Sequence, residues 1–200
     1  MTILQRKFGD EAWFSCAASY LSSRFLSVEA RLQTTFRYVD LNRENRNAFS
    51  YEFASILRDS GSIFSSVADA LVRGAKGAPK HEYDFGDYRE FLREEVPDIH
   101  RRTVCLRPCF PAGIVVPFEE LCERTGTPKW WHAYNLVKHR EYYEFHVGNL
   151  ENCVIAVSAL ALLGQLMGVF ISDGLFVNVG IAYDEKSVDM SDERRLFSRG

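Results

Sequence analysis

The chain has 200 residues, of which 46% are apolar and 26% are charged. This length and composition are typical of an ordinary globular protein, and we expect a single domain over residues 1–200. The formal net charge of −3 argues against a protein that coats nucleic acid without specificity, because such proteins are strongly basic. This net charge does not exclude a local basic site.

The five cysteines are odd in number and irregularly spaced, which is typical of reduced thiols rather than of a disulfide framework. Residues 1–7 lack the apolar core of a secretory signal peptide, so we expect a cytoplasmic protein. Cys105, Cys109 and Cys122 raise the alternative of a thiolate metal site, but the second short-spaced ligand pair that zinc prefers is missing. The sequence therefore predicts buried thiols, no metal and no cofactor.

Two long amphipathic segments open the chain. Between residues 11 and 38, apolar side chains recur at steps of three and four, which predicts a helix with Asp10 as its N-cap. The polar run 42–47 is typical of a loop. Ser50 is then the expected N-cap of a second helix over 51–72.

Gly61 lies in the middle of the second predicted helix, where glycine costs about 1 kcal/mol relative to alanine. Either the helix kinks there, or another backbone or a ligand comes close to it. We favour the second explanation, in which the glycine permits close packing.

The segment between the second and third helices, about 75–126, is predicted to be an insertion. It contains a short helix at 88–95 that ends before Pro97. Between residues 103 and 118, three prolines exclude a helix while 114–116 favours β structure. We therefore expect a loop or a short hairpin there.

The fourth predicted helix, 150–171, carries no charged residue from position 153 onward. A run of this length raises the alternative of a membrane span, but three amphipathic helices need an apolar partner, so we expect a buried core helix and no membrane. A β-like segment follows at 175–183, and a polar tail at 184–200. The predicted fold is mainly α: a four-to-five-helix up-down bundle with a proline-rich, β-like insertion and a small β-like C-terminal tail.

The third helix, expected to begin at Pro128 with Thr127 as its N-cap, concentrates aromatic and titratable side chains. A predicted buried stripe follows helical spacing and comprises Trp130, Ala133, Tyr134 and Val137. The adjacent, more polar side carries Trp131, Asn135, Lys138 and His139. Because adjacent tryptophans are not expected to share one core, Trp131 should meet the 103–118 segment, the C-terminal tail or a second subunit.

His139 is the candidate general acid or base, because the pKa of an imidazole ordinarily lies near neutrality. Asn135 lies one helical turn earlier and would orient it, while Lys138 and Arg140 would bind phosphate. The same pattern is also typical of an exposed helix face with solvated cations and a histidine that bonds to a neighbour.

The run 134–139, followed by a long apolar helix, resembles the second half of HEPN domains. These are all-α, often dimeric bundles of prokaryotic toxin and phage-defence systems. Active members are metal-independent ribonucleases whose motif is an arginine, a polar residue, three variable positions and a histidine. Asn135 and His139 match that motif, and the resemblance loosely covers residues 11–72 and 127–171.

The arginine of the HEPN motif falls on Tyr134 in this chain. The resemblance therefore implies that phosphate binding needs another source, for which Arg58 and Arg73 on the second helix are also candidates. Asp59 is a possible acidic partner of the site. The substrate-binding candidates are Lys138, Arg140, Tyr134 and Asp59.

Two functions from different classes follow from these residues. The first is a non-catalytic dimer, joined through Trp131, that binds RNA, a nucleotide or a partner protein in a prokaryotic defence or toxin–antitoxin role. The second is a metal-independent endoribonuclease that uses His139 and Asn135. The missing motif arginine favours the first function.

Overall fold

The computed structural model describes residues 2–77, 82–106, 113–169 and 176–180. Its α-helices are α1 (Ile3–Phe8), α2 (Ala12–Thr35), α3 (Tyr51–Lys76), α4 (Phe85–Glu95), α5 (Lys129–Glu144) and α6 (Leu150–Leu166). The strands are β1 (Thr103–Leu106), β2 (Gly113–Val115) and β3 (Phe176–Gly180). Short 3₁₀ turns are η1 (Ile99–Arg101), η2 (Glu119–Cys122) and η3 (Phe145–Val147). The predicted mainly-α fold with a small amount of β structure is confirmed.

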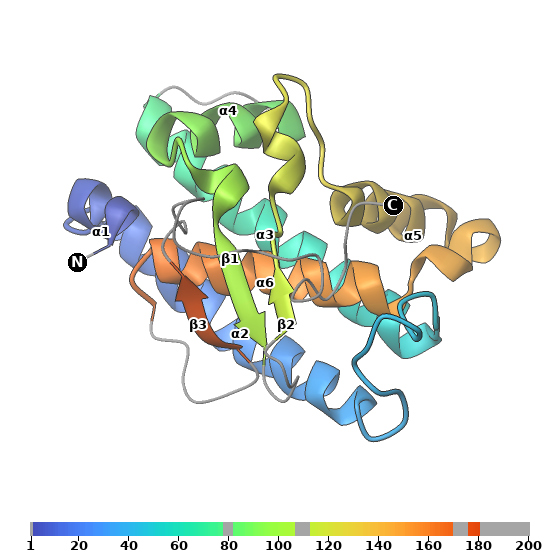
Figure 1. Ribbon diagram of the computed structural model, residues 1–200. Coiled ribbons are helices and arrows are strands. Elements are labelled where there is room, and N and C mark those ends of the chain that lie inside the picture. Colours follow the sequence, from blue (N-terminus) through green and yellow to red (C-terminus); the bar gives the residue numbers. More distant parts are fainter. Residues whose placement is uncertain (1, 78–81, 107–112, 170–175, 181–200) are drawn as a thin grey trace.

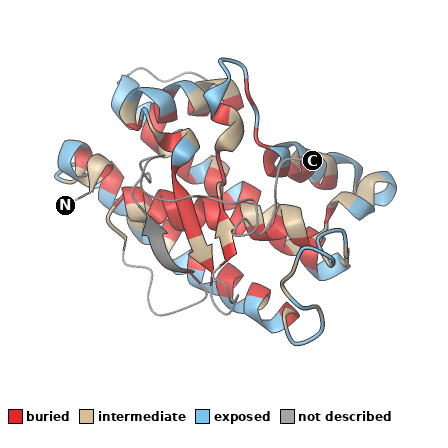
Figure 2. Ribbon diagram, in the orientation of Figure 1, coloured by how far each residue is buried: buried red, intermediate tan, exposed pale blue. Residues whose placement is uncertain are grey.

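Helix α6 runs through the middle of the molecule and contacts α2, α3 and α5 (Figure 1). It is buried along most of its length, and its one buried hydroxyl, that of Ser158, donates to the Val154 carbonyl at 2.8 Å. Figure 2 shows most of this helix as buried. A helix that is apolar all round is stable in such a position because no face of it meets solvent. The predicted buried core helix is confirmed. No helix in the described part of the chain combines the length and apolarity that crossing a membrane requires.

The three strands form one antiparallel sheet in the order β2-β1-β3. Val104 pairs with Val115 on one side and with Val179 on the other, so the hairpin and the C-terminal strand share their central strand. The hairpin confirms one of the two structures expected for residues 103–118. The pairing with β3 was not expected, and the sheet lies across α6 (Figure 1). The polar tail predicted at 184–200 lies outside the described residues.

The helix ends show which local signals are reliable. Ser50 caps α3 as predicted, because its hydroxyl accepts from the Phe53 amide at 3.1 Å. The predicted cap Asp10 is wrong: Glu11 holds the N-cap position of α2 without a side-chain bond. Thr127 is wrong by one residue, since Pro128 is the N-cap of α5.

One helix was not predicted, and the bounds of several others differ from those predicted. Helix α1 was missed, although burial of Leu4 and Phe8 ties it to the core. Helix α6 ends at Leu166 rather than at residue 171, and Gly168 follows with a φ of +75°. A glycine in this left-handed conformation commonly terminates a helix, because other side chains are strained there.

Gly61 lies where α3 meets α5. A Cβ atom at this position would lie 2.3 Å from ring atoms of Tyr134. The packing explanation is therefore confirmed, although the group that comes close is a side chain and not a backbone or a ligand. This contact brings α5 against α3 and sets the position of the whole candidate site.

Candidate functional site

The first half of α5 is part of the protein core. The four residues of the predicted stripe (Trp130, Ala133, Tyr134 and Val137) are at most 4% exposed. The Trp130 indole Nε1 donates to the buried carbonyl of Pro117 at 2.9 Å, so its polar atom is satisfied. The stripe predicted from helical spacing is confirmed.

Trp131 also lies in the core, with only 9% of its surface exposed. Its ring centroid is 5.7 Å from that of Trp130, and the two rings meet edge to face. Around it, at centroid distances of 5.0 to 6.0 Å, are Phe64, Phe85, Tyr88 and Tyr134. The expectation that adjacent tryptophans cannot share one core is wrong, because α4 adds a second aromatic wall.

The position of Trp131 bears on the predicted dimer interface. Its partners come from α3, α4 and α5 itself, and thus from none of the three expected places. Helix α4 belongs to the 75–126 insertion but precedes the 103–118 segment. Trp131 does not present the outward-facing ring that an interface anchor needs.

Tyr134, which replaces the motif arginine, is 2% exposed. Its hydroxyl lies 3.5 Å from the Ser62 hydroxyl, and the Lys138 Nζ lies 5.4 Å from its ring centroid. The burial of this ring counts against the substrate-binding role predicted for Tyr134. Lys138 itself is exposed and stays a candidate for phosphate binding.

No hydrogen bond joins the side chains of Asn135 and His139. The Asn135 amide Nδ2 donates instead to the Trp131 carbonyl of its own helix at 3.0 Å. His139 is exposed, and its side chain makes no hydrogen bond or ion pair with any residue that the structure describes. The two residues lie one turn apart as predicted, but the orienting bond expected between them is not formed.

Asp59 belongs to a different group of side chains. The guanidinium of Arg31 on α2 donates to Asp59 at 2.5 Å, to Glu52 at 2.8 Å and to Ser55 at 2.9 Å, all on α3. Hydrogen bonding to Glu52 is the main cause that raises the pKa of Arg31. Asp59 thus ties α2 to α3, and no described contact connects it to His139.

The second half of α5 is exposed. The helix kinks at Arg140, whose φ of −140° and ψ of 30° are not helical. Beyond it, Tyr142 and Tyr143 are 89% and 80% exposed, with ring centroids 5.1 Å apart in an edge-to-face pair. A hollow of about 570 Å³ lies here, lined by His139, Arg140, Tyr142, Tyr143 and Glu144. We call it the α5 hollow.

A second group of aromatic rings surrounds Phe145, the residue that follows Glu144 of the α5 hollow in the chain. The ring of Phe145 packs on Tyr51 at 4.2 Å and on Phe49 at 5.6 Å, and both partners are more than half exposed. Backbone bonds from Leu150 to Ala48, and from Ser50 to Gly148, hold these two chain segments together. Sequence reasoning missed this cluster, although three aromatics in the run 142–145 without core periodicity were a readable signal.

Metal binding finds no support among the described residues. They contain no group of three or more histidine, cysteine or acidic side chains that could hold an ion. Burial raises the pKa of the half-buried Cys105, and Cys109 lies outside the described residues. The expectation of buried thiols holds for Cys153, whereas Cys16 and Cys122 are exposed.

Comparisons of the chain with protein-family models, with curated proteins and with solved structures found no match. The likeness to HEPN domains therefore depends on the run 134–139 and on the order of the helices.

Proposed function

We propose that this protein is an RNA-binding helical bundle whose binding surface is the α5 hollow. The observation that carries this proposal is the pair of outward-facing rings, Tyr142 and Tyr143, beside Arg140 and His139 on one hollow. Large aromatic side chains are rarely left in water together without a partner. Here the rings lie next to a fixed positive charge.

A single-stranded nucleic acid matches both parts of this surface. Bases stack on exposed tyrosine rings, which contributes about 1–3 kcal/mol per base. The guanidinium of Arg140 suits a phosphate because its planar N–H groups match two phosphate oxygens. Lys138 is a second exposed cation of α5, but it precedes the kink at Arg140 and its Nζ lies over the Tyr134 ring, so Arg140 is the cation that lines the α5 hollow.

The charge of the chain limits the kind of binding. With a net charge of −3, only a local contact with one or two phosphates is expected, and Glu144 in the lining repels others. The affinity should therefore depend only weakly on salt, with a logarithmic slope of about −1 to −2. Stacking, rather than charge, supplies most of the binding free energy.

The HEPN resemblance supplies the wider setting of the proposal, a dimeric RNA-binding partner in a prokaryotic defence or toxin–antitoxin system. The motif likeness at Asn135 and His139 supports it. With Trp131 inside the core, the dimer contact would have to use another surface, and the exposed rings of Phe49 and Tyr51 are available.

The alternative function, a metal-independent endoribonuclease, is supported by the exposure of His139 beside Arg140 in the same hollow. Two observations weaken it: Asn135 bonds to its own helix, and Tyr134 is buried where the family has arginine. A nuclease needs a group that stabilises charge on the phosphorane, and Arg140 is the candidate that lines the same hollow as His139.

Fluorescence anisotropy with a labelled single-stranded RNA tests the proposal. Tyr142→Ala and Tyr143→Ala should each weaken binding about tenfold, the loss expected for one stacked base. Tyr38→Ala is the matched control, because Tyr38 is 84% exposed on a different part of the molecule. Absence of binding by the unsubstituted protein, or equal binding by Tyr143→Ala, would reject the proposal.

The same RNA, incubated with the protein and resolved on a gel, separates the two functions. The binding function predicts intact RNA, and retention of binding in His139→Ala. Cleavage that His139→Ala abolishes would instead establish the ribonuclease.

A further inference from the structure

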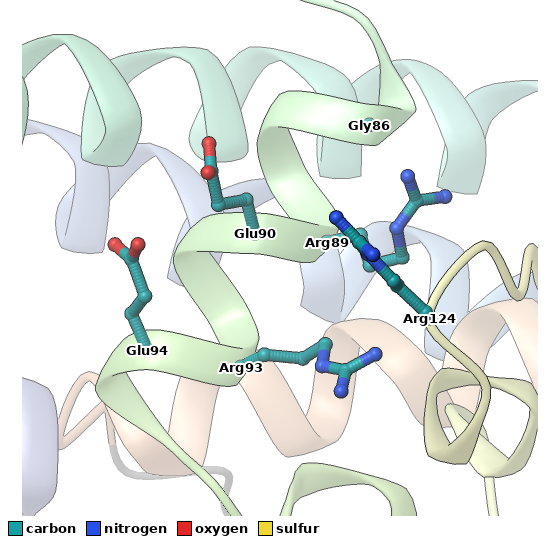
Figure 3. Close-up of a pocket in the computed structure, with 6 residues that line it drawn as sticks. All are labelled: Gly86, Arg89, Glu90, Arg93, Glu94 and Arg124. Carbon is teal, nitrogen blue, oxygen red and sulfur yellow. The ribbon is translucent and has the colours of Figure 1, made fainter.

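A second hollow lies between α4 and the chain that follows η2. Its volume is about 570 Å³, and its lining is Gly86, Arg89, Glu90, Arg93, Glu94 and Arg124 (Figure 3). None of these residues belongs to the α5 hollow. Three arginines in one small hollow are an unusual concentration of positive charge in an acidic chain.

The positive and negative side chains of this hollow lie on different faces of α4. Arg89 and Arg93 are four residues apart and share the face of α4 that is turned to Arg124, whereas Glu90 and Glu94 point the other way (Figure 3). Glu90 forms an ion pair of 2.8 Å with Lys76 at the end of α3. Glu90 is therefore paired with Lys76, and both carboxylates point away from the guanidinium groups.

The arginines are held in place by backbone atoms. Arg93 Nη1 donates to the Glu123 carbonyl at 2.9 Å, and Arg89 Nη1 donates to the Gly126 carbonyl at 3.4 Å. These bonds orient the two guanidinium groups but do not neutralise them. Each guanidinium has five N–H donors, so most of the donors of both groups stay available.

The loop that supplies Arg124 is tightly closed. A Cβ at Gly126 would lie 1.7 Å from the Glu120 carbonyl oxygen, so only glycine fits there. The Gly126 amide also donates to the Glu123 carbonyl at 3.2 Å. Arg124 thus projects from a fixed turn, and it makes no hydrogen bond or ion pair with any described residue.

The N-terminus of α4 is not the source of anion affinity in this hollow. The Asp84 carboxylate already accepts from the amides of Gly86 and Asp87, at 2.7 and 3.2 Å. The three guanidinium groups are thus the donors that face the hollow. Their mutual repulsion is relieved when an anion with several charges binds between them.

We infer that Arg89, Arg93 and Arg124 form a binding site for a diphosphate group. Phosphate oxygens match the planar forks of guanidinium groups, and two linked phosphates can contact all three. The lining holds no aromatic ring, so the site recognises phosphate and not a base. The diphosphate can be inorganic pyrophosphate or part of a nucleotide, and this inference does not depend on RNA binding at the α5 hollow.

Isothermal titration of the full chain with inorganic pyrophosphate tests the site. Saturable binding to one site with a dissociation constant of about 10–100 μM is expected. Arg124→Gln should weaken it about tenfold or more, since a charge-assisted contact is lost without loss of any internal bond. Arg93→Gln should weaken pyrophosphate binding similarly. Thermal melting of this variant shows whether loss of the bond from Arg93 to the Glu123 carbonyl also destabilises the fold.

The matched control is Arg24→Gln, because Arg24 is an exposed arginine on α2 whose side chain makes no hydrogen bond or ion pair with any described residue. This variant should bind pyrophosphate as the unsubstituted chain does. Tyr143→Ala should also bind normally, which separates this site from the α5 hollow. The same titration with ADP should give an affinity within about threefold of pyrophosphate. A much tighter ADP complex that Arg124→Gln weakens equally would support the site and assign its ligand as a nucleotide. No saturable binding at about 1 mM pyrophosphate, or equal binding by Arg124→Gln, would overturn the inference.

Discussion

The two halves of α5 carry similar residue types in opposite surroundings. Before the kink, Trp130, Trp131 and Tyr134 are buried among aromatic rings of α3 and α4. After it, Tyr142 and Tyr143 face solvent beside Arg140. Aromatic residues next to cations therefore do not mark a binding surface by themselves. The elements that pack on each half decide which rings stabilise the fold and which are free to bind.

The largest effect that tests this comparison is the loss of a buried ring. Trp130→Ala should lower the free energy of unfolding by about 3–5 kcal/mol, because it leaves a cavity and deprives the Pro117 carbonyl of its donor. Urea denaturation measures the change. A loss below about 1 kcal/mol would show that the first half of α5 is not a core element.

Gly61→Ala tests the contact that positions α5. Helix propensity alone would stabilise α3 by about 1 kcal/mol, but the new methyl group would meet the Tyr134 ring at 2.3 Å. We expect a net destabilisation of about 1–3 kcal/mol in urea denaturation.

A double-mutant cycle checks the cause of that effect. With Tyr134→Ala as background, the added methyl group has room, so Gly61→Ala should then cost much less than in the unsubstituted chain. Strict additivity of the two substitutions would contradict the proposed contact.

Tyr88 packs on Trp131 in the buried half of α5, and its ionisation makes the free energy of unfolding depend on pH. Burial, and next the hydrogen bond that its hydroxyl donates to Asp69, raise the pKa of Tyr88 above its ordinary value. The folded state thus favours the protonated phenol, and this stability is present below about pH 10 and is lost as the pH rises above it. Urea midpoints at rising pH should fall less steeply for Tyr88→Phe than for the unsubstituted chain.

The Tyr88→Phe variant should also lose about 1 kcal/mol near neutral pH, because the Asp69 carboxylate loses a donor. An alkaline loss identical in both proteins would show that other groups cause it.

The smallest expected effect concerns the exposed half. Tyr142→Ala and Tyr143→Ala should change the free energy of unfolding by no more than about 0.5 kcal/mol, since exposed side chains contribute little to stability. Their effect should be on RNA affinity instead. A variant that loses stability and keeps RNA affinity would show that the second half of α5 stabilises the fold and does not bind RNA.

The long helices, the capping of α3 and the buried stripe of α5 were predictable from local sequence patterns. These features depend on neighbours three and four residues apart, so that the amphipathic repeat of α2 and the Ser50 hydroxyl acting on the Phe53 amide were predictable. The burial of α6 followed from its apolar character, because its amphipathic neighbours needed an apolar partner.

The contacts between polar and aromatic residues of different helices could not be predicted in this way, because they depend on how the helices pack. Trp131 is buried because Phe85 and Tyr88 approach from α4, and Asp59 is engaged because Arg31 reaches it from α2. The three arginines come together because the turn at Gly126 closes against α4, and β3 joins a hairpin distant in the chain. Each of these contacts joins segments whose separation in sequence carries no periodic signal, so packing alone brings them together.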